Sequence, residues 1–141
     1  MRPEPDVIRQ CLRAFADAQV THFGVLWNKL FQRVGRRVHH TGFRVYRSDL
    51  GRDAAYVVLF VEASRSNGED VSWSVGLNVS SERMEIAGRV EVTGDDGTRE
   101  LFGHTEIASD CAQAAEFIAC LSAEVCAQDR YMEDSAESGA A

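Results

Sequence analysis

The chain has 141 residues, of which 45% are hydrophobic and 26% are charged, and its formal net charge is −7. This is the size of one ordinary domain, which can bury a core without the help of disulfides or metals. The acidic balance argues against a general nucleic-acid binder and against binding to an anionic membrane, because both need basic surface.

The first predicted element is a long N-terminal helix. Residues 7–34 repeat apolar side chains at helical spacing. Asp6 suits a helix start and Gly35 suits a helix end. Residues 20–24 include β-branched side chains and a glycine, so we expect the helix to kink or break there.

Five strand-like segments follow the helix, separated by short turn-like links. They span residues 37–47, 54–63, 71–79, 83–93 and 98–107. Links this short cannot hold a crossover helix, so successive strands must pair as antiparallel hairpins. The sequence therefore predicts a five-stranded antiparallel meander.

The third and fourth segments alternate apolar and polar side chains. One face of the third segment carries Val71, Trp73, Val75, Leu77 and Val79. A sheet with one apolar and one polar face is covered on one side only, so both helices must pack on the same face. The predicted fold class is α+β: a two-layer sandwich of a long N-terminal helix, the meander and a C-terminal helix.

The C-terminal helix is predicted to start at Ser109 or Asp110, with Gln113 completing a capping-box pattern. From residue 128 onward the chain is acidic and rich in small residues. Such a composition predicts a disordered tail over residues 128–141. No repeat or linker marks a second domain, so we expect one α+β domain over residues 1–127.

The second strand departs from the alternation. Tyr56, Val58 and Phe60 place apolar side chains on the face that is otherwise polar, and Tyr46 of the first strand is expected on the same face. We expect this row to be at least partly exposed. An exposed apolar patch of this kind marks an interaction site. The alternative is that the basic first strand, the 48–53 loop or the tail covers it.

Arginines gather between residues 33 and 53. They can complement the end of the first helix, guard an edge strand or dock an acidic partner. The predicted interface residues are Tyr46, Tyr56, Val58, Phe60, Arg44 and Arg47.

No motif for catalysis, metal binding or phosphate binding stands out. His39 and His40 are adjacent, so on a strand they face opposite ways. The four cysteines form no CxxC pair and are expected to be free thiols. Residues 94–97, Gly-Asp-Asp-Gly, have the chemistry of a hairpin turn. We predict no catalytic residue, no metal and no cofactor.

The chain begins without a signal-peptide pattern and holds no apolar run long enough for a membrane span, so a cytoplasmic location is expected. Lys29 is the single lysine among fifteen basic residues, which together with the alanine content indicates a bacterial genome of high GC content.

In its small size, acidity and α+β pattern the chain is similar to type III secretion chaperones and, more loosely, to polymorphic-toxin immunity proteins. The chaperone pattern places a helix within the sheet, whereas only residues 80–82 separate the third and fourth strands here.

The preferred function is a non-catalytic protein-binding module that acts through the helix-free sheet face, in the manner of an immunity protein or a secretion chaperone. One alternative is a small-molecule-binding or enzymatic domain of the cystatin-like or nuclear-transport-factor type, which would show a deep pocket. A second alternative is a structural homodimer. The expected partner is thus a protein or a second copy of the chain.

Overall fold

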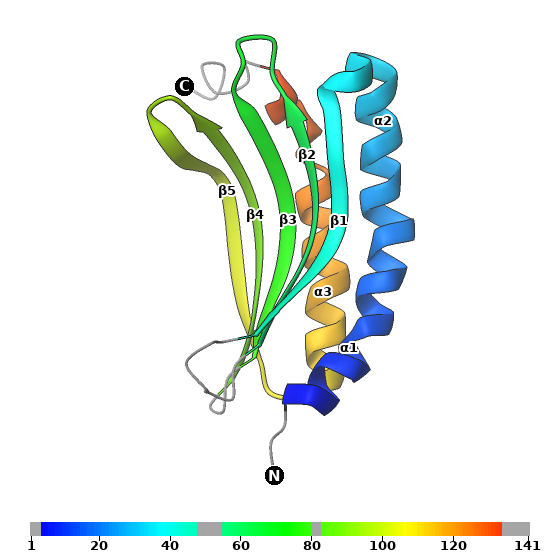
Figure 1. The fold of residues 1–141 in the computed structure, drawn as a ribbon. Helices are drawn as coiled ribbons and strands as arrows, with labels where there is room; N and C mark the ends of the chain where they lie inside the picture. The colour runs from blue at the N-terminus through cyan, green and yellow to red at the C-terminus, as the bar shows by residue number, and fades with distance from the viewer. Residues whose placement is uncertain (1–3, 48–54, 80–82, 134–141) are drawn as a thin grey trace.

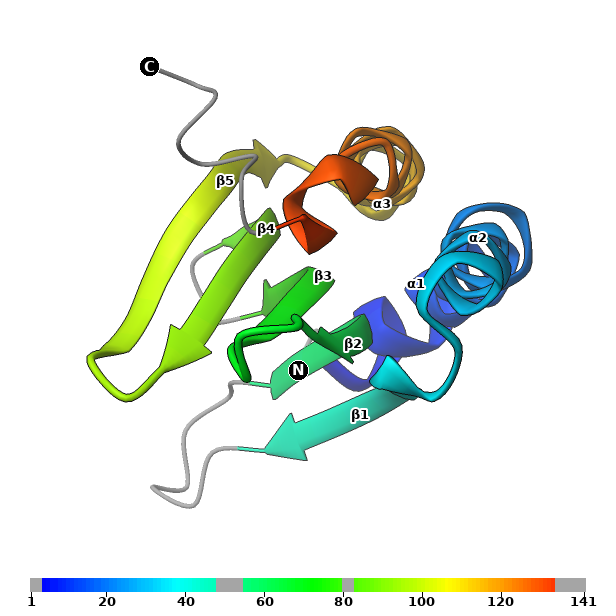
Figure 2. The same cartoon turned by 90° about the horizontal axis from the view of Figure 1, so that it is seen from above.

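The computed structural model describes residues 4–47, 55–79 and 83–133, without the side chains of residues 4–8, 10, 46, 47 and 55. The elements are α1 (Glu4–Ala18), a π-helical turn η1 (Gln19–Phe23), α2 (Gly24–Val34), a short 3₁₀ turn η2 (Gly35–Arg37), β1 (Val38–Arg47), β2 (Ala55–Ser64), β3 (Asp70–Val79), β4 (Met84–Gly94), β5 (Gly97–Ala108), α3 (Cys111–Cys126) and a 3₁₀ turn η3 (Asp129–Met132). The strands are joined in chain order into one antiparallel sheet. Figure 1 shows α3 behind the sheet and the continuous α1–α2 helix beside β1, and Figure 2 shows all three labelled helices on one side of the sheet. The α+β meander with both helices on one face is therefore confirmed.

Where a kink or break was expected, the N-terminal helix is interrupted by a π turn but does not end. The backbone stays helical through residues 19–23 and widens into one π turn, in which the Gly24 N–H donates to the carbonyl of Gln19. Gly24 suits this position because a Cβ there would lie 3.1 Å from that carbonyl oxygen. The buried positions step by five residues between Ala18 and Phe23, and the wider turn absorbs that step. The apolar stripes of α1 and α2 thus both face the sheet.

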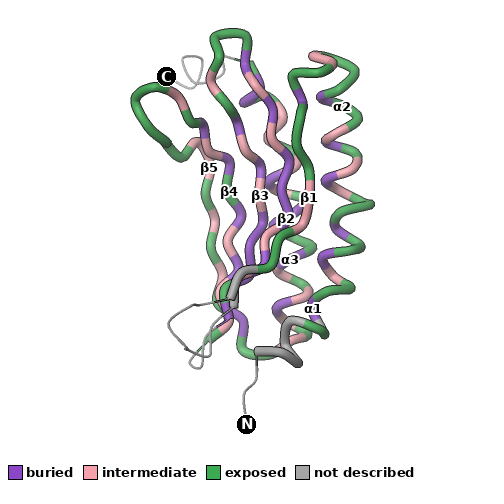
Figure 3. The backbone as a smooth tube through the Cα atoms, viewed as in Figure 1, coloured by how far each residue is buried: buried purple, intermediate pink, exposed green. Residues whose placement is uncertain are grey.

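The core lies between the helices and the sheet. Its largest fully buried side chains include Trp73, Phe15, Phe23, Leu26, Leu30, Leu59, Leu77, Ile86, Ile118 and Leu121. The predicted apolar face of the third strand is buried from Val71 to Val79, and the tube in Figure 3 shows burial concentrated in the inner strands. Alternation along the strands has placed this face correctly.

The predicted local signals at α3 and at the β4–β5 turn are also confirmed. The Asp110 Oδ1 accepts from the Gln113 N–H at 2.8 Å, and the Gln113 Oε1 accepts from the Ser109 N–H at 2.7 Å. The hairpin between β4 and β5 turns at residues 94–97, where Gly97 has a φ of 104°. The link predicted at residues 66–69 also forms a turn, in which the Gly68 N–H donates to the carbonyl of Arg65 at 3.0 Å. The links predicted at residues 49–52 and 80–82 lie outside the described residues.

The tail predicted from residue 128 does not begin there. Residues 129–132 form η3, in which Tyr131 and Met132 are buried against the core. The indole of Trp73 donates to the carbonyl of Gln128 at 3.0 Å. The buried guanidinium of Arg65 donates to the carbonyl of Tyr131 at 3.0 and 2.7 Å. The domain therefore extends at least to residue 133, and residues 134–141 lie outside the description.

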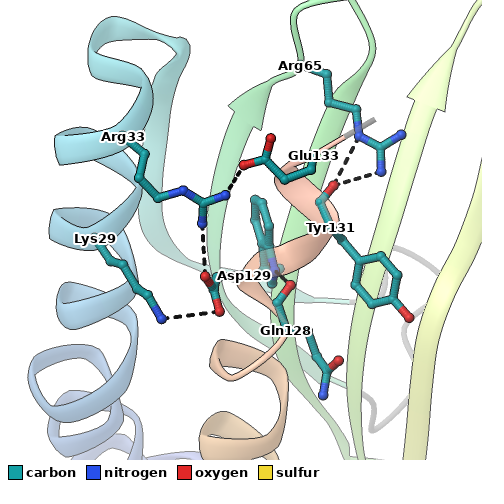
Figure 4. Close-up of polar contacts among 8 residues, drawn as sticks. Lys29, Arg33, Arg65, Gln128, Asp129, Tyr131 and Glu133 are labelled. Atoms are coloured by element: carbon teal, nitrogen blue, oxygen red, sulfur yellow. Dashed lines mark hydrogen bonds and ion pairs between the residues drawn. The ribbon is translucent and has the colours of Figure 1, made fainter. Parts of the chain in front are cut away.

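Ion pairs from α2 also hold this C-terminal segment. Arg33 pairs with Asp129 at 2.9 Å and with Glu133, and Lys29 pairs with Asp129 at 3.3 Å (Figure 4). Arg33, one of the clustered arginines, thus joins α2 to η3 rather than standing free for an acidic partner.

Candidate interface on the helix-free sheet face

The face of the sheet opposite the helices carries the apolar row that was predicted from the second strand. Antiparallel pairing sets Tyr46 opposite Tyr56, Arg44 opposite Val58 and Gly42 opposite Phe60. The side chains of Tyr46 and Arg47 lie outside the described residues, so their predicted place in the interface stays a prediction. The structure brings together Arg44, Tyr56, Val58 and Phe60, which line one hollow of about 250 Å³.

Phe60 is more covered than expected. Its side chain is 6% exposed, although we expected the whole row to be at least partly exposed. The Arg44 guanidinium lies 4.7 Å from the ring centroid, and the His40 ring lies 6.2 Å from it on the same edge strand. A Cβ added to Gly42 would meet the Phe60 ring at 3.4 Å, so the ring rests on β1. The basic strand therefore covers Phe60, as the alternative reading proposed, but does not cover the rest of the row.

Tyr56 and Val58 are half-buried and remain on the surface. The Tyr56 ring leans away from β1, across Gly76 of β3, and Phe60 leans the opposite way, toward β1. Val58 lies between the two rings along β2, and Ser74 and Ser72 line the hollow opposite Phe60 and Glu62. The predicted apolar row is thus divided, because Phe60 packs against β1 whereas Tyr56 lies across β3.

Two carboxylates that the sequence reasoning did not select also line this hollow. They are Glu62, at the end of the apolar row, and Glu91, on β4. In the part of the chain that the structure describes, neither makes an ion pair or a side-chain hydrogen bond. The alternation of each strand could have identified them, because both glutamates are at positions whose side chains point to the helix-free face.

Three other clusters lie away from this face. His104 on β5 contacts Glu124 on α3 and Glu106, each at 3.1 Å, and the hydrogen bond with Glu124 is the main cause that raises its pKa. Burial raises the pKa of Cys11 to about 11, with a smaller contribution from Cys111. These features describe a surface charge cluster and an unreactive thiol rather than a catalytic centre.

The third is a groove of about 560 Å³ between α1 and α3, floored by alanines and lined by Arg13, Asp17, His22 and Glu116. Its charged residues have both signs and favour no single class of ligand. Over residues 4–47, 55–79 and 83–133, no three His, Cys, Asp or Glu side chains are placed to hold a metal ion.

Comparison with models of protein families, with curated proteins and with solved structures finds no match to this chain. Among the described residues, no helix has the length and apolar character that crossing a membrane requires. The case for function therefore rests on the chemistry of the sheet face.

Proposed function

We propose that this chain is a non-catalytic protein-binding module of the cytoplasm that holds its partner on the helix-free face of the sheet. The observation that carries the proposal is the hollow beside the apolar row. Tyr56 and Val58 stay on the surface there, and Glu62 and Glu91 have no partner within the described residues. Aromatic side chains at the centre with polar groups around them are typical of protein interfaces.

The interior of the sandwich supports this proposal over a cystatin-like or nuclear-transport-factor-like domain. Such a domain encloses its ligand between the helices and the curved sheet. Here that space is filled by side chains such as Trp73, Phe15 and Leu30, which are fully buried. Ligand access to the interior would require repacking this core, which is costly.

The charge of the chain supports a basic partner. With a net charge of −7, the molecule attracts basic proteins at long range and speeds their encounter. An immunity protein that blocks a basic toxin has this requirement, and so does a chaperone that holds a basic cargo. A homodimer through the same face is the competing form, because it would use the same apolar row.

The test is capture of a partner by variants with a less apolar face. Tyr56→Ser with Val58→Ser removes the two half-buried side chains of the row. The matched control, Val20→Ser with Val25→Ser, removes two exposed apolar side chains from the N-terminal helix instead, since these are 77% and 59% exposed. In lysate of the cells that make the chain, the proposal expects one stoichiometric partner with the wild type and the control, and its loss with the face variant.

Equal capture by both variants would contradict the proposal. Sedimentation of the purified chain distinguishes a homodimer from a complex with another protein. If the mass doubles with concentration and the face variant abolishes that doubling, the face serves self-association.

A further inference from the structure

Glu62 and Glu91 stand on either side of one strand, over a serine. The register sets Glu62 of β2 opposite Ser72 of β3, and Ser72 opposite Glu91 of β4. Neighbouring strands lie about 4.8 Å apart, so the two glutamate backbones are separated by roughly 10 Å. The side chain between them is short, which leaves open space between two carboxylates on the same face.

The other glutamates of this face have cationic partners. Glu85 pairs with Arg83 at 3.3 Å, and Glu100 lies 3.6 Å from Arg89. Within the described residues, Glu62 and Glu91 have none. Two half-buried carboxylates that line one hollow raise its affinity for a cation.

The walls of the hollow select the kind of cation. Tyr56, Val58 and Phe60 line it together with the two carboxylates, so an entering cation contacts aromatic and apolar side chains as well as negative charge. A guanidinium suits such walls, because its flat, weakly hydrated plane stacks on aromatic rings and its fork of N–H groups pairs with carboxylates. The hydroxyls of Ser72 and Ser74 add acceptors on the floor.

The size of the hollow limits the occupant to one side chain. Its volume of about 250 Å³ lies below the range of roughly 300–1,000 Å³ that is usual for drug-sized ligands. Arg44 also lines it, but the guanidinium of Arg44 lies over the Phe60 ring. Two carboxylates against one guanidinium leave the hollow with a net negative charge.

We propose that the hollow is the anchor pocket for one arginine side chain of the partner, an inference that rests on the proposed function of this face. The guanidinium is held by Glu62 and Glu91 over Ser72, while the apolar stem of the arginine runs over Ser74 toward Val58 and the Tyr56 ring. The arginine is thus the residue of the partner whose loss weakens binding most.

A short peptide tests the pocket without the natural partner. The probe is acetyl-Gly-Arg-Gly-amide, titrated at low ionic strength into the full chain and followed by amide NMR shifts. The same peptide with citrulline keeps the shape of arginine and removes the charge. We expect saturable shifts centred on Ser72 and Ser74 with the arginine peptide, and none with the citrulline peptide.

Two pairs of variants make the test specific. Glu62→Gln with Glu91→Gln should weaken binding of the peptide about tenfold or more, since the charge-assisted hydrogen bonds to both carboxylates are lost. Glu85→Gln with Glu116→Gln removes the same net charge elsewhere and should change affinity less than about twofold. Ser74→Arg should abolish binding by filling the hollow, whereas Thr105→Arg, exposed on β5 of the same face, should not.

Unaltered binding to the Glu62→Gln, Glu91→Gln variant, or equal binding of the citrulline peptide, would overturn the anchor pocket. So would shifts spread over the whole surface, or no binding at all. Partner capture that still depends on Tyr56 and Val58 would in that case leave the proposed function standing. Conversely, the arginine peptide could bind although the face variant captures the partner as well as the wild type does. That result would contradict the proposed function alone.

Discussion

The ring of Tyr56 lies across Gly76 on the neighbouring strand, so closely that a Cβ on Gly76 would meet the Tyr56 Oη at 2.5 Å. A glycine within a strand normally weakens it, because there is no side chain to pack. Here the aromatic ring of the adjacent strand covers the gap, and this contact fixes one wall of the hollow.

The contact predicts that Gly76→Ala destabilises the fold by about 1 to 3 kcal/mol, because the ring must move off the strand. Tyr56→Ala should cancel most of that cost, so a double-mutant cycle measured by urea unfolding should show strong coupling between the two positions. Additive effects would mean that the ring does not rest on the glycine.

Phe60 should behave as a buried residue rather than as a surface one. Phe60→Ser is expected to cost about 3 kcal/mol or more, since the ring is packed under Arg44 and against Gly42. Val58→Ser, in the same row but half-buried, should cost about 1 kcal/mol. Equal, small losses in the two melting curves would show that β1 does not cover the ring.

Arg65 should be essential for holding the C-terminal segment. Arg65→Met leaves the carbonyl of Tyr131 without its donors, so a loss of about 2 to 3 kcal/mol is expected. The control Arg36→Met removes an exposed arginine and should be nearly neutral. Hydrogen exchange should show amides 131–133 losing protection in the first variant; unchanged exchange there would contradict the described packing.

The His104 cluster should make stability depend on pH. Its folded-state pKa is raised, mainly by the hydrogen bond with Glu124, so protonated His104 stabilises the fold. That contribution is complete below the unfolded pKa of about 6.5 and is lost as the pH rises through the folded pKa. Because the pair is exposed, the effect should not exceed about 1 kcal/mol. His104→Gln should remove this decline between neutral and mildly alkaline pH, and an identical decline in the variant would refute the assignment.

The sequence was sufficient for the fold because strand alternation and short links leave few arrangements. Trp73 and its neighbours on β3 show the period of two that one covered face requires. Residues 128–133 were missed because the tail was judged by its average composition. Tyr131 and Met132 should have indicated order there, since two large apolar side chains just after a helix are expected to be buried against the core.

The candidate site was predicted less completely, because its details depend on how side chains lean. Period two put Tyr56, Val58 and Phe60 on one face, but it could not tell that Phe60 turns toward β1 and Tyr56 toward β3. The placement of Glu62 and Glu91 on either side of Ser72 depends on the register of three strands, which the sequence of one strand cannot reveal. The π turn was likewise recognisable only as the five-residue step from Ala18 to Phe23.

The claim that a partner sits on the helix-free face is tested most directly by photo-crosslinking in the cells that make the chain. A photoreactive residue replaces Ser74, inside the hollow, or Ala119, in the groove between α1 and α3. The account predicts one discrete adduct with a basic protein from position 74 and none from position 119. An adduct from position 119 alone, no adduct from either position, or an adduct from position 74 with a second copy of the chain would contradict it.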